Sequence, residues 1–134
     1  MLQPWRTYTK IVILEKEGQI IGVAAGGRSR DAADADEYEN YALYIHPDFQ
    51  GQGLGHRLWL ERARLLQASG ARQLHTWVFE KNHKARAAYE SWGAQPAQPW
   101  QRTVQLGNST LTEVHYVWDL SEPTLQAALT KGTK

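Results

Sequence analysis

The glycines of one short segment carry the clearest chemical signal in this 134-residue chain. Gln50 to Gly55 reads QGQGLG; it follows an extended segment that ends at His46-Pro47 and precedes a helical pattern. Glycines let a main chain approach a ligand closely and adopt positive φ angles. The start of a helix adds N–H groups without partners and a partial positive charge, which suit a phosphate. The segment therefore predicts a turn that binds a pyrophosphate.

The spacing of these glycines shows which of the known phosphate-binding patterns the segment fits. A Walker A loop ends in Gly-Lys-Ser/Thr, whereas Gly55 is followed by His-Arg. A dinucleotide-binding loop needs G-x-G-x-x-G, whereas Gly51, Gly53 and Gly55 are spaced by two throughout. The pattern that fits is Gln/Arg-x-x-Gly-x-Gly/Ala, filled by Gln50, Gly53 and Gly55. The alternative interpretation is that the glycines only shape a strand-to-helix turn.

Extended segments must lead the chain into this turn. The apolar runs Ile11–Leu14 and Ile20–Ala25 flank a polar segment with one glycine and predict a β-hairpin. Gly26–Asp36 has no apolar period and predicts an exposed loop. Tyr38–His46 alternates as a third strand, which Pro47 ends because proline cannot donate to a strand ladder.

The elements after the turn complete a mixed fold. We expect a helix from Gly53 to a stop at Gly70, a strand over Gln73–Phe79, a helix capped by Asn82 and stopped by Gly93, and a hairpin of Thr103–Leu106 with Leu111–Leu120. Arg57, Glu61 and Arg64 should face away from the apolar side of the first helix. The order β-β-β-α-β-α-β-β predicts a single α/β domain over residues 1–120, with one parallel crossover between antiparallel hairpins. Residues 121–134 form a polar tail.

Composition excludes several classes of protein. Apolar residues make up 42% of the chain and charged residues 22%, values typical of globular domains rather than disordered chains. The net charge of +1 is too small to favour nucleic acid or an anionic membrane as partner. Cysteine is absent, which excludes thiolate metal sites and cysteine nucleophiles. With no signal-peptide pattern and no apolar run of membrane length, we expect a cytoplasmic protein.

Four features in order resemble the GNAT superfamily of acyl-CoA-dependent N-acyltransferases. ENYALYIHPDF resembles that family's central strand, the glycine-rich turn its acyl-CoA signature, and RQLHTWVFE its next strand. Asn82, Ala85, Tyr89 and Gly93 fill the motif N-x-x-A-x-x-x-Y-x-x-x-G. The resemblance implies a mostly antiparallel sheet with packing helices, in which a central parallel strand pair splays apart.

The resemblance also implies how acetyl-CoA binds as cosubstrate, with no metal. The pantetheine arm would enter the splayed gap and pair with the main chain of Leu43, Tyr44 and Ile45, and Asn82 would bond it directly or through water. The pyrophosphate would accept hydrogen bonds from the N–H groups of Gln50, Gly51, Gln52, Gly53, Leu54, Gly55 and His56. Lys84 and Arg86 either approach the nucleotide phosphate or form an ordinary solvated helix face.

The implied chemistry is direct attack of an amine on the thioester. An amine is mostly protonated at neutral pH, so a base is needed. By resemblance Glu39 is the preferred base, with Glu37 and His46 as rivals; the alternative is that Glu39 is a solvated residue at a strand end. Tyr89 matches the family's tyrosine acid, which protonates the departing thiolate, although its helical position also fits core packing. An N–H near Ile45 would polarise the thioester carbonyl.

One departure from the family pattern concerns the start of the chain. The family fold opens with a strand and two helices, which residues 1–10 are too short to hold. Three explanations remain open: truncation, completion of the cleft by a second copy in a homodimer, and acyl-CoA binding without turnover. The function hypotheses are therefore an N-acetyltransferase acting on a small-molecule or peptide amine, and a non-catalytic acyl-CoA-binding module. The acceptor is not specified by the sequence.

Overall fold

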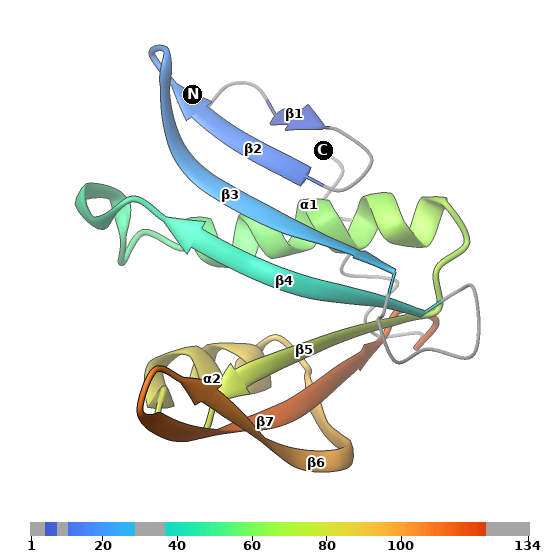
Figure 1. The fold of residues 1–134 in the computed structure, drawn as a ribbon. Helices are drawn as coiled ribbons and strands as arrows, with labels where there is room; N and C mark the ends of the chain where they lie inside the picture. Colours follow the sequence, from blue (N-terminus) through green and yellow to red (C-terminus); the bar gives the residue numbers. More distant parts are fainter. Residues whose placement is uncertain (1–4, 8–10, 29–36, 123–134) are drawn as a thin grey trace.

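The computed structural model describes residues 5–7, 11–28 and 37–122, and within them the chain forms one seven-stranded sheet in the order β1-β2-β3-β4-β5-β7-β6 (Figure 1). The strands are β1 (Trp5–Thr7), β2 (Ile11–Lys16), β3 (Gln19–Arg28), β4 (Glu37–Ile45), β5 (Gln73–Phe79), β6 (Gln95–Leu106) and β7 (Ser109–Asp119). Neighbours pair antiparallel except β4 and β5, which are parallel. The predicted mixed, mostly antiparallel fold is confirmed.

The parallel strands β4 and β5 pair over only part of their length. Their register joins Glu37–Asn40 to Gln73–Thr76, and no pairing follows. Each strand continues further, β4 to Ile45 and β5 to Phe79. Figure 1 shows the two strands diverging toward the end that carries the glycine-rich turn. The predicted splayed pair is therefore present, and it leaves main-chain groups of both strands without a strand partner.

The helices lie on one face of the sheet, α1 (Leu54–Ala68) behind β2–β4 and α2 (His83–Ser91) behind β5–β7 (Figure 1). Two hydrophobic clusters result, one on each side of the split. Leu54 and Leu58 of α1 pack with Val12, Leu14 and other residues of β2 and β3. Further along α1, Trp59, Ala63 and Leu66 form the second cluster with residues of β5 and β7, among them Leu74, Val78, Val114, Tyr116 and Trp118. Since α1 belongs to both clusters, it joins the halves that the strands leave apart.

Several predicted boundaries and one face differ from the structure. The strand β1, over Trp5–Thr7, was not predicted. Gly26 to Arg28 extend β3 instead of starting a loop, and residues 29–36 lie outside the described residues. A Cβ on Gly26 would lie 2.1 Å from Glu39 O and 2.5 Å from Arg62 Nη2, so glycine allows this close approach.

The solvent face predicted for α1 is also partly wrong. Glu61 is only 8% exposed, and its carboxylate forms an i,i+3 ion pair with Arg64. Arg62 is 3% exposed and reaches the carbonyl of Glu39. The helix is therefore covered on more than its apolar stripe.

Candidate functional site

The glycine-rich turn has the backbone that its sequence predicts. Gly51 and Gly53 both have φ of 78°, a left-handed conformation that residues with a side chain rarely adopt. A short 3-10 helix, η1 (Pro47–Phe49), separates the turn from β4. The side chain of Gln50 donates from Nε2 to the carbonyl of Ile45 at 3.0 Å, which ties the turn to the end of the strand.

The start of α1 presents unpaired donors to the turn. The first helical hydrogen bond runs from Arg57 N to Gly53 O at 3.2 Å, so the preceding amides have no acceptor in the helix. No side chain caps this end. The ring of His56 stacks on Trp92 with centroids 5.3 Å apart, and burial lowers the pKa of His56 from 6.5. At this helix end, main-chain N–H groups and the helix dipole are therefore the groups suited to an anion.

A cavity of about 470 Å³ opens beside the turn. Its lining contains the predicted acid, Tyr89, and most of the predicted donor-binding residues: Leu43, Ile45, Gln50, Gly51, Gly53, Leu54, Gly55, His56 and Asn82. Two other predicted residues, Tyr44 and Gln52, are absent from the lining. The side chain of Tyr44 is instead exposed.

Strand alternation explains the position of Tyr44. His46 N donates to Ile21 O of β3 at 2.8 Å, so the main chain of Tyr44, two residues earlier, also faces β3. The main-chain groups of Leu43 and Ile45 therefore face the split between β4 and β5. The bond from the Gln50 side chain to Ile45 O, on the cavity side, agrees with this assignment.

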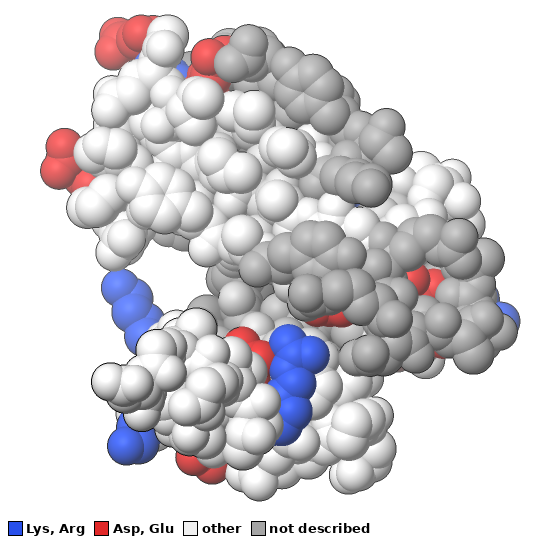
Figure 2. Space-filling model, viewed as in Figure 1, with Lys and Arg blue, Asp and Glu red and all other residues white. Residues whose placement is uncertain are grey.

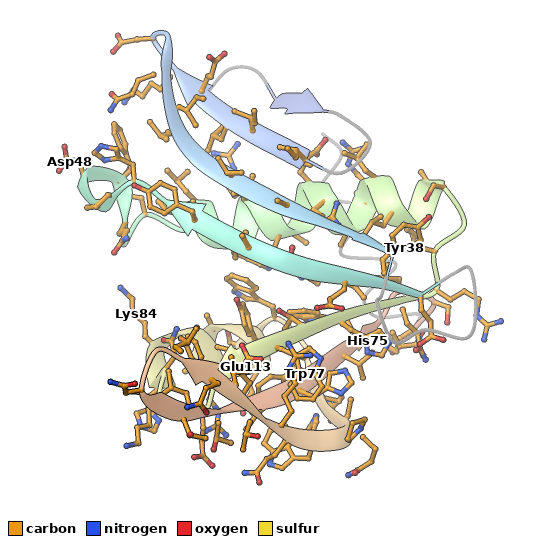
Figure 3. All side chains as sticks on the ribbon, in the orientation of Figure 1. Tyr38, Asp48, His75, Trp77, Lys84 and Glu113 are labelled. Atoms are coloured by element: carbon orange, nitrogen blue, oxygen red, sulfur yellow. The ribbon has the colours of Figure 1, made fainter. Side chains whose placement is uncertain are left out.

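The two basic residues at the start of α2 have different surroundings. Lys84 lines the cavity, and Figure 3 shows its side chain reaching from α2 toward the gap; it is the basic side chain that projects into the opening in Figure 2. Arg86 instead donates to Tyr116 Oη at 3.1 Å and to Glu80 O at 2.9 Å. Asn82 caps α2 as predicted, its Oδ1 accepting from Ala85 N at 3.2 Å.

A second cavity, of about 240 Å³, adjoins the first across the split. Its lining comes from β4, β5, β7 and the region of α2: Asn40, Ala42, Leu43, Thr76, Trp77, Val78, Phe79, Asn82, Tyr89 and Glu113. Leu43, Asn82 and Tyr89 line both cavities. Tyr89 therefore lies where two separate approaches to the split meet.

The surroundings of Tyr89 favour a neutral phenol. Burial raises the pKa of Tyr89 above 10.0, and a hydrogen bond with the Thr76 side chain acts in the opposite direction. Thr76 stands at the last position of β5 that pairs with β4, and its hydroxyl donates to Asn40 O at 3.3 Å. The ring of Tyr89 packs against Trp92 and Trp118, with centroids 5.7 Å and 5.5 Å away. Tyr89 is thus a fixed, protonated hydroxyl at the junction of the cavities.

The three carboxylate and imidazole candidates for a base lie apart from both cavities. Glu39 is 2% exposed and lines neither cavity. Glu37 contacts His75 Nε2 at 3.1 Å, and His46 Nδ1 accepts from Asp48 N at 3.1 Å.

Glu113 lies at the smaller cavity, and sequence reasoning did not single it out. Its Oε1 accepts from Arg102 Nε at 2.7 Å, and the guanidinium lies 4.2 Å from the ring centroid of Trp77. In Figure 3 Glu113 and Trp77 lie close together on the face of β5 turned away from α2. Glu113 belongs to the predicted C-terminal hairpin. The sequence does not show which strand of that hairpin borders β5, and in the structure it is β7 and not β6.

Metal-binding clusters and membrane-spanning helices are both absent from the described part of the chain. Within residues 5–7, 11–28 and 37–122, no group of three or more His, Asp or Glu side chains could hold a metal ion. The described helices include none long and apolar enough to cross a membrane.

The chain is similar to known proteins both in sequence and in structure. The Acetyltransferase (GNAT) family model matches residues 2–94. A putative ribosomal protein bS18-alanine N-acetyltransferase of Bacillus subtilis is 32% identical over 89 residues, which cover 66% of this chain and 56% of that protein. An acetyltransferase of Yersinia enterocolitica is 29% identical over 78% of this chain and 68% of its own length. The chain thus spans about half to two thirds of these relatives.

Solved structures agree in fold. The ribosomal-protein-S18-alanine N-acetyltransferase of Escherichia coli has a TM-score of 0.70 at 23% identity, covering 87% of this chain and 72% of that one. A putative acetyltransferase of Salmonella typhimurium, solved with acetyl-CoA, has a TM-score of 0.71 at 22% identity, covering 84% of this chain and 65% of that one. With a match over residues 2–94, the split β4–β5 pair and the turn before α1, the chain belongs to the GNAT acetyltransferase family.

Proposed function

We propose that this chain transfers an acetyl group from acetyl-CoA to a primary amine of a small molecule or peptide. The observation that carries the proposal is the meeting of two cavities at Tyr89, one of which begins at the glycine-rich turn. A transferase that joins two substrates directly needs two approaches to one reacting atom. The split between β4 and β5 supplies both.

The donor would occupy the larger cavity. Its pyrophosphate would accept hydrogen bonds from the amides of Leu54, Gly55 and His56 and from the glycine turn before them. Its pantetheine arm would pair with the main chain of Leu43 and Ile45, as a peptide pairs with a strand edge. Lys84, at the cavity wall, would approach a phosphate.

The reaction would proceed by direct attack of the amine on the thioester, which needs no covalent enzyme intermediate, and the chain has no cysteine to form one. An ammonium group with a pKa of about 10 is roughly 0.1% neutral at pH 7, so removing its proton costs about 4 kcal/mol. Tyr89 would give a proton to the departing sulfur, and the N–H of Ile45 would stabilise the negative oxygen of the intermediate. The family resemblance suggests Glu39 as the base, but the burial of Glu39 argues against direct contact with an acceptor.

We also propose a class of acceptor and an oligomeric state. The relatives named for the alanine of bS18 make a peptide N-terminal amine the first acceptor to test. Ile11 and Tyr44 are exposed by 36% and 50% on the sheet face opposite α1. We propose that a second copy covers this face; light scattering that shows only a monomer at micromolar concentration would contradict it.

The test of function is thiol release from acetyl-CoA in the presence of an alanyl peptide and a panel of small amines. We expect amine-dependent thiol release and an acetylated amine detected by mass spectrometry, with hydrolysis in the absence of amine as the control. Tight binding of acetyl-CoA by calorimetry without release across the panel would instead support a non-catalytic acyl-CoA-binding module.

A further inference from the structure

The smaller cavity contains a carboxylate with no assigned role. We propose that Glu113 is the group that binds the ammonium of the acceptor and takes its proton. This inference rests on the proposed acetyl transfer and deepens it, because it names the base and the acceptor end of the same site.

Strand register carries Glu113 to the opening of the split. In the β5–β7 ladder Glu113 stands opposite Phe79, at the end of β5. The last β4–β5 pair is Asn40 with Thr76, so Phe79 already lies where β4 has moved away. Among the described residues that line the two cavities, Glu113 is the only one with a carboxylate, and it shares its cavity with Tyr89.

The carboxylate is held in place and still has one oxygen available. Its side chain is 15% exposed, and Oε1 accepts the bond from Arg102 Nε. Among the described residues Glu113 makes no other hydrogen bond or ion pair, so Oε2 keeps its acceptor capacity. Arg102 is itself fixed by its position over the Trp77 ring. In Figure 2 acidic and basic atoms adjoin at the place that Figure 3 labels Glu113.

The rival groups lack this combination. Glu39 is nearly as buried as the hydrophobic core, and Glu37 is paired with His75. An ammonium that approached Glu39 would have to lose its water and enter a closed region, which is costly for a charged group. At Glu113 the ammonium would form a charge-assisted hydrogen bond at a cavity mouth that is open to solvent.

The proton and electron balance of this step is complete. The ammonium gives one proton to Glu113, and the neutral nitrogen forms the C–N bond with the thioester carbon. The C–S bond then breaks, and its electron pair stays on sulfur, which takes the proton of Tyr89. The second proton lost by nitrogen returns to the Tyr89 oxygen through water, and Glu113 releases its proton to solvent.

A comparison of two amine acceptors of similar size can distinguish a general base from a residue that has only a structural role. Ethylamine is almost wholly protonated at pH 7, whereas 2,2,2-trifluoroethylamine is almost wholly neutral and needs little help from a base. In Glu113→Gln we expect kcat/KM for ethylamine to fall roughly 100-fold or more, the usual scale of general-base catalysis. The loss for trifluoroethylamine should be only a few-fold. Equal losses for both amines would overturn the assignment, and so would a large, ethylamine-selective loss in Glu39→Gln with none in Glu113→Gln.

The control variant is Glu80→Gln, since Glu80 also bonds a β6 side chain, Gln101, but lines neither cavity. It should keep wild-type rates for both amines. A second readout needs no turnover: ethylammonium added to the CoA complex should shift the indole NMR signal of Trp77, and Glu113→Gln should abolish that shift. An intact shift in Glu113→Gln would refute the inference. A Glu113-dependent shift without turnover in the wild type would refute only the proposed function.

Discussion

The two cavities at the split are built from different parts of the chain. The larger one is lined mainly by a continuous segment, the end of β4, the turn and the start of α1, whose main-chain N–H groups have no acceptor in the helix, and α2 adds side chains that include Lys84 and Tyr89. The smaller one takes side chains from β4, β5, β7 and α2, which are far apart in sequence. Main-chain binding suits a constant ligand, the CoA moiety, whereas side chains select among acceptors. We therefore expect changes to the larger cavity to alter affinity for acetyl-CoA, and changes to the smaller one to alter turnover and acceptor choice.

The largest effect should come from Tyr89, the proposed acid and one of three residues that line both cavities. Tyr89→Phe removes the proposed acid and keeps the ring that packs against Trp92 and Trp118. We expect kcat to fall roughly 100-fold or more, with little change in the Kd of acetyl-CoA. Steady-state kinetics and calorimetry measure the two quantities. An unchanged kcat would remove Tyr89 from the mechanism.

A change in the turn should affect affinity alone. Gly53→Ala places a side chain at φ 78°, a strain of about 1 kcal/mol or more that the turn relieves by moving its N–H groups. We expect the Kd of acetyl-CoA to rise roughly tenfold, since 1.4 kcal/mol corresponds to that factor. Gly70→Ala is the matched control, because Gly70 has φ 98° after α1 and lines neither cavity. A loss of affinity in the control as large as in Gly53→Ala would mean that both act through stability.

The hydroxyl of Thr76 should have a smaller effect, confined to turnover. Thr76→Val removes the hydrogen bond that lowers the pKa of Tyr89, so the pKa of Tyr89 should rise further above 10.0. The loss of activity at high pH should therefore begin at a higher pH, and kcat should fall about fivefold, as the loss of one hydrogen bond of about 1 kcal/mol predicts. Thr76→Ser keeps the hydroxyl and should restore both values. A pH–rate profile that is the same in all three proteins would exclude Thr76 as a positioning residue.

The smallest effect should be on the pH dependence of folding stability, through His115 of β7. Burial lowers the pKa of His115 below 6.5, so the folded state favours neutral imidazole. As pH falls from above 6.5 toward the lowered pKa, the unfolded state binds more protons and stability declines. His115→Asn should reduce the slope of Tm against pH below 6.5, leaving the similar contribution of His56. An unchanged slope in calorimetric melts would show that His115 does not contribute to acid sensitivity.

The contrast between a cavity built from one continuous segment and a cavity built from distant strands also explains which features the sequence predicts well. The turn, the Asn82 cap and the strand Gln73–Phe79 depend on neighbours in sequence, and all three are confirmed. Glu113 gains its position from the order of strands, in which β7 lies between β5 and β6. The burial of Glu61 likewise depends on packing that no local pattern records. Local chemistry could be inferred from residue types, whereas the acceptor side required the register of distant strands.

The central claim is that donor and acceptor meet at Tyr89, and a crystal structure with acetyl-CoA tests it most directly. We expect the pyrophosphate at the amides of Leu54, Gly55 and His56, the pantetheine along Leu43 and Ile45, and the thioester sulfur within hydrogen-bond reach of the Tyr89 hydroxyl. A pyrophosphate bound away from the turn, or a sulfur beyond the reach of Tyr89, would contradict this account.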